Sequence, residues 1–99
     1  MDHNSQNVEN IVFVGNSKPT MKYITAIVTI SHKRIPEIIV RARGNAISKA
    51  VDVVEKVRHQ FLPDLQIKNI NIGTDKIKSL RGPTYVSTIE IILKNPSNT

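Results

Sequence analysis

Two arginines and a glycine stand where this sequence predicts that a strand passes into a helix. Arg41, Arg43 and Gly44 follow the apolar run 38–40 and precede a segment with strong helical periodicity. Because the first N–H groups of a helix have no partner and the helix dipole favours an anion, such a junction suits a phosphate group. Arginine adds a charged planar fork that matches phosphate oxygens. On this segment alone, a solvated turn with two surface arginines explains the pattern equally well.

The charge balance of the 99-residue chain also favours an anionic partner. Fourteen Lys and Arg oppose eight Asp and Glu, which gives a formal net charge of +6, and a basic domain attracts polyanions. Among the first ten residues, Asp2 and Glu9 are acidic and there is no Lys or Arg, so the basic charge belongs to the part that folds. With two Tyr, two Phe and no Trp, the chain is poor material for stacking single-stranded bases on an aromatic sheet.

The same composition argues against several classes of protein. Without cysteine there are no disulfides, zinc–thiolate sites or thiol catalysis, and no run approaches the roughly 18 apolar residues of a membrane span. The histidines lack metal-ligand spacing, and Asp52, Glu55 and Asp64 have no His or Ser arranged for a triad. The segment 15–20 lacks the full phosphate-loop pattern. We expect a soluble, intracellular protein that is not an enzyme and binds no metal, cofactor, membrane or small-molecule substrate.

Periodicity and composition divide the chain into one domain and two tails. We predict a folded domain at residues 10–94, a disordered tail at 1–9 and a second polar tail at 95–99. The predicted elements, in chain order, are a buried strand at 11–14, a helix from Thr20 to about Lys33, a strand at 37–43, a helix from Asn45 to about Leu62, two strand segments around 65–67 and 70–72, and a strand at 86–93. The Asn45 side chain can cap the second helix.

This order predicts an α+β fold, a two-layer βαβαββ sandwich with two helices on one face of a four-stranded mixed sheet. The strand–helix–strand start implies parallel neighbours. In the third strand the apolar residues stand at odd positions up to Ile67 and at even positions from Ile70 on, so we expect a β-bulge near Lys68-Asn69. Gly82-Pro83 is a turn signal, and basic residues lie around it. The last two strands therefore form a long protruding hairpin with a basic tip.

Two basic loops should lie at one end of this sheet. Both the loop after the first strand and the junction after the second leave the C-terminal ends of parallel strands, which meet at the same edge. Tyr23 can instead pack with its hydroxyl at the surface, and Lys49 can simply solvate its helix. With the hairpin tip included, the candidate nucleic-acid-binding residues are Ser17, Lys18, Lys22, Tyr23, Arg41, Arg43, Asn45, Lys49, Lys76, Lys78 and Arg81.

Three segments of the chain occur together in one known family. They are GNSKPTMKY at 15–23, RARGNAISKAVDVVE at 41–55 and VSTIEI at 86–91. In order and spacing they resemble the Alba family of small archaeal nucleic-acid-binding proteins, and the match runs from about Asn10 to Lys94. The resemblance implies the βαβαββ fold, which is also similar to the C-terminal domain of bacterial translation initiation factor three.

The resemblance further implies how the basic residues act. In the family, a basic body surface sits on the phosphate backbone and two hairpin arms reach along the minor groove. Lys18, Tyr23 and Arg43 match family positions. Asn45 stands where the family has a second arginine, and Ser17 where many members have a lysine. Each departure removes one positive charge from the expected contact surface.

The chain is also expected to form a homodimer. The second helix ends in an apolar segment, and excess apolar surface on a small domain usually meets a partner. The family resemblance implies a dimer, which would duplicate the basic surface. The candidate residues for the dimer seam, or for contacts between dimers on DNA, are Val57, Phe61, Leu62 and Leu65.

Two functions remain open at this stage, and a third is weaker. The first is a cytoplasmic, chromosome-associated protein that coats and compacts double-stranded DNA without sequence preference. The second is an RNA-binding protein of the same fold, which acts on structured RNA or as a ribonucleoprotein subunit. In the third, the chain is an interaction module whose basic charge serves only solubility.

Overall fold

The computed structural model describes residues 10–95. The predicted tail at 1–9, and residues 96–99 of the predicted tail at 95–99, lie outside the described residues. The described chain confirms the βαβαββ order. Its elements are β1 (Ile11–Val14), α1 (Thr20–His32), β2 (Glu37–Arg43), α2 (Ala46–Lys56), a π-helical turn η2 (Val57–Phe61), β3 (Gln66–Ser79) and β4 (Gly82–Lys94).

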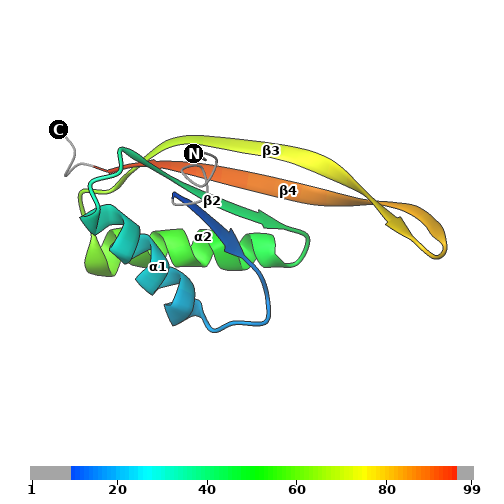
Figure 1. Cartoon of the computed structure of the whole chain (residues 1–99), viewed down its shortest axis with the longest axis horizontal. Coiled ribbons are helices and arrows are strands. Elements are labelled where there is room, and N and C mark those ends of the chain that lie inside the picture. The colour runs from blue at the N-terminus through cyan, green and yellow to red at the C-terminus, as the bar shows by residue number, and fades with distance from the viewer. Residues whose placement is uncertain (1–9, 96–99) are drawn as a thin grey trace, which may run out of the picture.

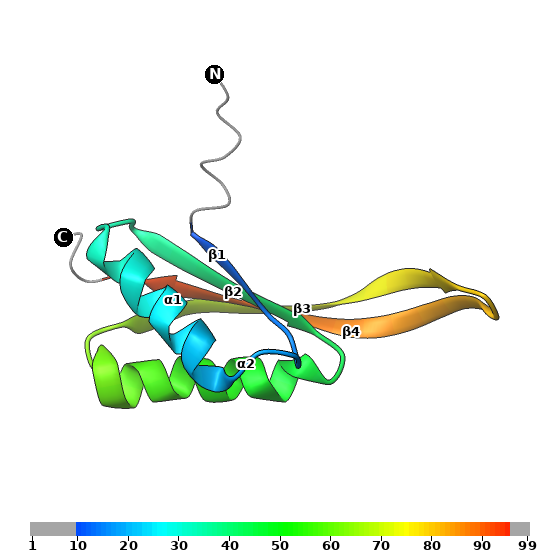
Figure 2. The same cartoon turned by 60° about the horizontal axis from the view of Figure 1, so that its bottom comes forward.

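The four strands form one mixed sheet in the order β1-β2-β4-β3. β1 runs parallel to β2, as predicted, and β4 runs antiparallel to both of its neighbours. The last strand in the chain therefore lies inside the sheet. Both helices cover the same face, which leaves the opposite face open (Figures 1 and 2).

The core lies between the helices and the sheet. Alternation along β2 turns Ile38, Val40 and Ala42 toward the helices, and all three are buried. Ile27 of α1 and Val53 of α2 meet them from the other layer and are fully buried. Burial of each such Ile or Val side chain contributes about 1.5–3 kcal/mol. These contacts hold α1 and α2 in place, and with them the loops at the ends of the strands.

The predicted bulge in β3 is confirmed, since the register shifts between Ile67 and Asn69. On either side of it, Ile67 pairs with a buried residue of β4 and Ile70 with Ile91, so the bulge keeps these side chains on the helix-covered face. β3 is an edge strand, however, and the helices do not cover its far part. Ile70 is therefore half exposed and Ile72 is 83% exposed.

The hairpin is longer than the sequence predicted. β4 begins at Gly82 and not at Val86, and the turn residues are Leu80 and Arg81. Gly82 has φ +108°, a conformation that favours glycine. Pro83 lies within the strand, opposite Lys78. Among the described residues, positions 82–87 pair only with β3, so the missing N–H of proline can face solvent at no cost.

Asn95 belongs to the fold, in contrast to the predicted polar tail. It is 3% exposed, and its side-chain amide donates to the Ser31 carbonyl at 2.9 Å and to the Ile35 carbonyl at 3.1 Å. Its backbone N–H donates to the Pro36 carbonyl at 2.9 Å. A polar residue can be buried when its hydrogen bonds are satisfied. Asn95 thus closes the end of α1 onto the end of the sheet.

Candidate nucleic-acid interface

Lys49 joins the two basic loops that the sequence placed at one end of the sheet. Its side chain leaves the first turns of α2, and its Nζ donates to the Lys18 carbonyl in the loop after β1. The same Nζ lies 5.3 Å from the centroid of the Tyr23 ring, within the range of a cation–π contact. The exposed Ser17 and Lys18 therefore lie beside the N-terminal part of α2 (Figure 2).

Tyr23 supports Lys18 and Lys49 from the core side. It is 7% exposed, its hydroxyl accepts the Gly15 N–H at 3.1 Å, and it donates to the Gly15 carbonyl at 3.2 Å. The ring packs in the core and under Lys49. Of the two roles considered for Tyr23, the structure therefore favours packing, with the hydroxyl holding the loop that presents Lys18. Lys22, one turn along α1, is exposed.

Arg43 ends β2 with 62% of its side chain exposed. One guanidinium nitrogen lies 3.8 Å from the Asp75 carboxylate at the root of the hairpin, which makes a loose ion pair in solvent. Gly44 follows with φ +58°, and its N–H donates to the Ser87 carbonyl at 2.9 Å. The strand–helix junction thus lies against the hairpin root and leaves most of Arg43 accessible.

The prediction that the Asn45 side chain caps α2 is wrong. Asn45 occupies the N-cap position with φ −66° and ψ −15°, and its side chain makes no capping hydrogen bond within the described chain. A capping side chain needs extended backbone geometry, and here the backbone is already helical. The Ile47 N–H instead donates to the Gly44 carbonyl at 3.2 Å. The exposed Asn45 side chain remains at the start of α2, near Arg43 in sequence.

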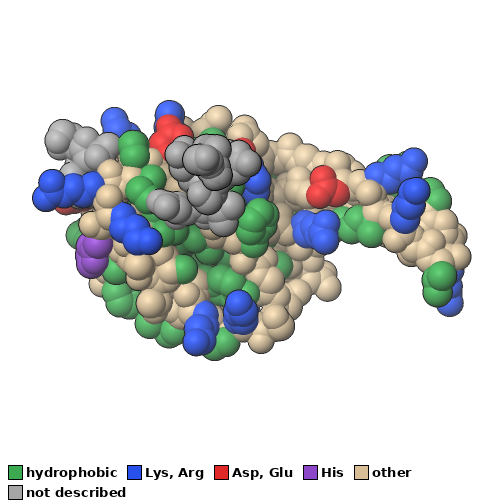
Figure 3. Space-filling view, viewed as in Figure 1, with side chains coloured by type: hydrophobic (Ala, Val, Ile, Leu, Met, Phe, Trp, Pro, Cys, Tyr) green, Lys and Arg blue, Asp and Glu red, His purple; other side chains and the backbone are tan. Residues whose placement is uncertain are grey.

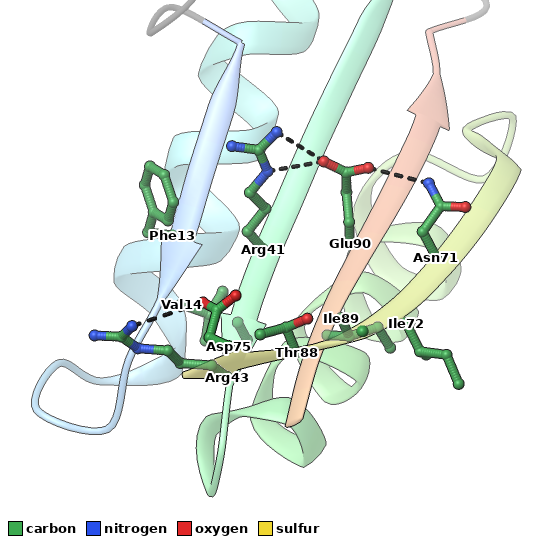
Figure 4. Close-up of a pocket in the computed structure, with 12 residues that line it drawn as sticks. Phe13, Val14, Arg41, Arg43, Asn71, Ile72, Asp75, Thr88, Ile89 and Glu90 are labelled. Carbon is green, nitrogen blue, oxygen red and sulfur yellow. Dashed lines mark hydrogen bonds and ion pairs between the residues drawn. The ribbon is translucent and has the colours of Figure 1, made fainter. Parts of the chain in front are cut away.

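Arg41 lies apart from the Lys18–Lys49 cluster. Its side chain projects from the open face of the sheet, and its Nε and Nη2 each lie 2.8 Å from Glu90 Oε2 (Figure 4). The Asn71 amide donates to the other carboxylate oxygen at 3.1 Å. Hydrogen bonds from Asn71 and Arg41 lower the pKa of Glu90, so the carboxylate is ionised and balances the charge of Arg41. Arg41 is thus paired within the fold.

The basic hairpin residues extend away from the body. The arm, defined as residues 74–87, holds Lys76, Lys78 and Arg81, and all three are exposed. Figure 3 shows basic side chains gathered near the end of the arm, well away from the body. The Ser79 hydroxyl donates to the Gly82 carbonyl at 2.6 Å and accepts the Arg81 N–H at 3.3 Å, which braces the turn. One chain therefore presents two separate basic regions.

Only part of the predicted oligomer interface is accessible. Val57 and Leu65 are buried in the core of their own chain, so neither can meet a partner in this conformation. Phe61 is 43% exposed and Leu62 is partly buried against the core. Sequence reasoning missed the exposed Ile70 and Ile72 of β3. The position of β3 at the edge of the sheet was the missing signal, because it leaves these isoleucines uncovered.

The described residues 10–95 hold no group of three His, Cys, Asp or Glu side chains that could bind a metal ion. None of the helices in this range is long and apolar enough to cross a membrane.

Comparison with known proteins identifies the family of this chain. The Alba family model matches residues 10–74. The chain is 53% identical over 85 residues to the DNA/RNA-binding protein Alba 1 of Archaeoglobus fulgidus, which covers 86% of this chain and 94% of that protein. The chain belongs to the Alba family.

Solved structures of Alba proteins share the fold. Alba from Thermoplasma volcanium superposes with a TM-score of 0.82 at 48% identity, over 86% of this chain and 99% of that one. ALBA1 from Trypanosoma brucei gives a TM-score of 0.71 at 28% identity, over 91% of this chain and 73% of that one. The relative from A. fulgidus matches this chain in sequence, and the one from T. volcanium in structure, over nearly their whole lengths.

Proposed function

We propose that this protein binds double-stranded nucleic acid through the phosphate backbone, without sequence preference, and coats and compacts DNA as a homodimer. The relative from A. fulgidus is named a DNA/RNA-binding protein, and the net charge of +6 suits a polyanion. In the cell, the proposal places the protein in the cytoplasm, on the chromosome.

One observation supports the proposal most directly: the hydrogen bond from Lys49 to the Lys18 carbonyl brings the two basic loops to one surface. Lys18, Lys22 and the first turns of α2 form its middle, and Arg43 lies at its border with the hairpin root. These groups are cations on loops and helix ends, which position a duplex by its phosphates and do not read bases.

The arm adds a second region of contact in this proposal. Its paired strands project Lys76, Lys78 and Arg81 beyond the body (Figure 3). A dimer would present two such arms. Lys and Arg on the arm would follow the phosphates on either side of the minor groove.

Binding of this kind depends strongly on salt. Each neutralised phosphate contributes roughly −0.9 to the slope of log K against log salt on duplex DNA. If about four to eight phosphates are contacted per dimer, the slope lies near −4 to −7. A flat salt dependence, or a hundredfold preference for one sequence, contradicts the proposal.

The site itself is tested by two variants that remove the same charge. Arg43→Ala removes a cation at the start of α2, whereas Lys56→Ala removes one from the exposed outer side of the same helix. Arg43→Ala should weaken duplex binding more at fixed salt, because the guanidinium and the helix N-terminus act on one phosphate. Equal losses would mean that only net charge matters.

The dimer has its own test. We infer that Ile72, with Ile70 and the exposed Phe61, meets a second copy on the helix-covered side of the β3 edge. Ile72→Asp should then convert the protein to a monomer of roughly 11 kDa in sedimentation equilibrium at tens of micromolar. Leu80→Asp places the same charge on another exposed residue, at the tip of the arm, and should leave the dimer intact. If the unmodified protein is itself a monomer in this measurement, the dimer proposal is wrong.

RNA is the alternative ligand, and the relatives from A. fulgidus and T. volcanium are named DNA/RNA-binding proteins. Phosphate contacts of the proposed kind accept an RNA duplex as well as a DNA duplex. A competition between matched duplexes of DNA and RNA ranks the two, and a clear preference for RNA would replace chromosome coating by a role on structured RNA.

A further inference from the structure

The open face of the sheet holds a hollow of about 730 Å³, which shares Arg43 with the proposed duplex contacts. It lies on the side away from the helices, across all four strands, and Figure 4 shows it from the open side. The side chains that matter here are Phe13, Arg41, Arg43, Asn71, Thr88 and Glu90. A concave site with a few convergent polar groups is typical of a ligand-binding site.

An exposed aromatic ring forms one wall of the hollow. The sequence predicted β1 as a buried strand, but the alternation of β1 buries Val12 and Val14 and turns Phe13 outward. Phe13 is 66% exposed, because β1 is an edge strand and the open face is not covered. A large apolar ring left in water provides a surface on which a planar ligand can stack.

Arg41 stands directly beside this ring. Phe13 and Arg41 are partners in the parallel β1–β2 register, and Figure 4 shows both side chains projecting from the same face. The pairing of Arg41 with Glu90 fixes the guanidinium plane, while 43% of its side chain stays exposed. An aromatic ring and an arginine side by side form the kind of surface on which proteins stack unpaired bases.

The neighbouring strands supply polar groups for the edge of such a ligand. Glu90 is held between Arg41 and Asn71, and its carboxylate can accept hydrogen bonds but donate none. Thr88 lies two residues before Glu90 in β4, so the two side chains are on the same face of the sheet. These groups suit the edge of a base that presents amino donors.

The positive charge of Arg43 can position the phosphate backbone of a nucleic-acid ligand. Arg43 borders the hollow, is largely exposed, and forms only a 3.8 Å contact with Asp75. It can therefore bind a phosphate attached to a base that lies in the hollow. The same residue borders the Lys18–Lys49 surface, so a strand could pass from one region to the other.

From these observations we propose that the open face is a second nucleic-acid site, which holds one unpaired base of a single strand. The base stacks on Phe13 beside Arg41, its edge faces Glu90, and its phosphate meets Arg43. A paired duplex cannot use this site, because its bases are already stacked and paired. The inference rests on the proposed binding of nucleic acid and extends it to single strands.

The first test compares Phe13→Ala with Met21→Ala, since both remove a large exposed apolar side chain but only Phe13 lies in the hollow. The probes are a twelve-nucleotide single-stranded RNA of mixed sequence and a duplex DNA, both fluorescently labelled. Phe13→Ala should weaken binding of the single strand by about 5- to 150-fold, the loss of one base–aromatic stack, and change duplex binding less than about twofold. Met21→Ala should leave single-strand binding unchanged.

Three outcomes overturn this site. Unchanged single-strand binding in Phe13→Ala excludes the stack. Equal losses on single strand and duplex would make Phe13 part of the duplex surface. A change of oligomeric state in Phe13→Ala would mean that a second copy covers the face. Failure of the proposed function looks different, because the unmodified protein would then bind no duplex at all.

A second variant reports stacking directly. The chain has no tryptophan, so Phe13→Trp introduces a single indole into the hollow. Single-stranded RNA should quench its fluorescence while preserving affinity, and duplex DNA should quench it far less. Equal quenching by both probes rejects the site.

Homopolymers test the role of Glu90. The site should bind single-stranded poly(A) and poly(C), whose bases present amino donors, a few-fold better than poly(U). Glu90→Gln should remove most of this difference, because the amide also offers a donor. A difference that persists in Glu90→Gln excludes recognition by this carboxylate.

Discussion

The body and the arm of this protein are built from the same kinds of residue but obey different constraints. In the body, Ile27, Ile38 and Val40 are fully buried between helices and sheet. In the arm, all of whose residues are described, each one is exposed or half-buried, and Leu80 at its tip is fully exposed. Packing of side chains therefore constrains the sequence of the body. The arm is held instead by backbone hydrogen bonds between β3 and β4. The arm residues are free to be chosen for contact with a ligand.

The largest expected effect is on stability, and it separates the two regions. Ile27→Ala removes a fully buried side chain from the body and should lower the free energy of unfolding by about 2–5 kcal/mol. Leu80→Ala trims the tip of the arm and should stay within about 0.5 kcal/mol of the unmodified protein. Urea titration monitored by circular dichroism measures both. A large loss in Leu80→Ala would show that the arm packs against something in solution.

Removal of charge should weaken binding in both regions but disturb only the body. Replacing Lys76, Lys78 and Arg81 together by Gln should reduce the salt slope on duplex DNA by up to about three units and leave thermal stability unchanged. Replacing Lys18, Arg43 and Lys49 by Gln should reduce the slope similarly and lower the melting temperature. The reason is that Lys49 holds the Lys18 loop. Identical melting temperatures would contradict the bracing role of Lys49.

Added charge on the body should sharpen the contrast further. Asn45→Arg and Ser17→Lys restore the basic residues of the family pattern, and each should tighten duplex binding and steepen the salt slope by about one unit. Gln60→Lys adds the same charge at an exposed position at the far end of the helical segment and serves as control. If Gln60→Lys has an equal effect, the body surface is not a localised site.

The smallest effect concerns the root of the arm, where Glu90 bridges β2 and β3. Its pKa is lowered in the folded protein, so its stabilising contribution is present above the unfolded pKa near 4.3 and is lost as pH falls through the folded value. Glu90→Gln should cost a few tenths of a kcal/mol at pH 7, and this difference should close below about pH 4. Unfolding curves between pH 3 and pH 7 test it, and a difference that is independent of pH would mean that the ionised carboxylate contributes nothing.

Local sequence patterns predicted the elements well and their exposure less well. Alternation and helical periodicity placed β1 and β2 at their observed bounds, and parity predicted the bulge after Ile67. The exposure of Phe13 and Ile72 depends on which strands form the edges of the sheet. Strand order is a non-local property, and no short pattern contains it.

A change of helical geometry explains the misplaced interface. Val57 and Phe61 are four residues apart, so an α-helix would place both on one face. Instead, η2 bonds residue i to i+5: the Leu62 N–H donates to the Val57 carbonyl at 2.7 Å. The wider turn leaves Val57 in the core and rotates Phe61 outward.

The sequence predicted which basic residues belong to the candidate site, but not which side chains pair with one another. Sequence placed Lys18, Arg43 and Lys49 together because parallel strands end at one edge, and the hydrogen bond from Lys49 confirms that the two loops meet. The partner of Arg41 is 49 positions away in the chain, beyond the reach of local reasoning. The same holds for the Asn95 contacts that close the fold.

The central position of β4 has a consequence for synthesis on the ribosome. Until residues 82–94 have emerged, β2 and β3 have no strand between them, and each exposes unpaired backbone. Most of the nascent chain is thus translated before the sheet can be completed, and the unpaired edges of β2 and β3 are prone to aggregation during that interval. Slow decoding between β3 and β4 would lengthen the exposure, so synonymous codon changes there should raise aggregation without altering the folded protein.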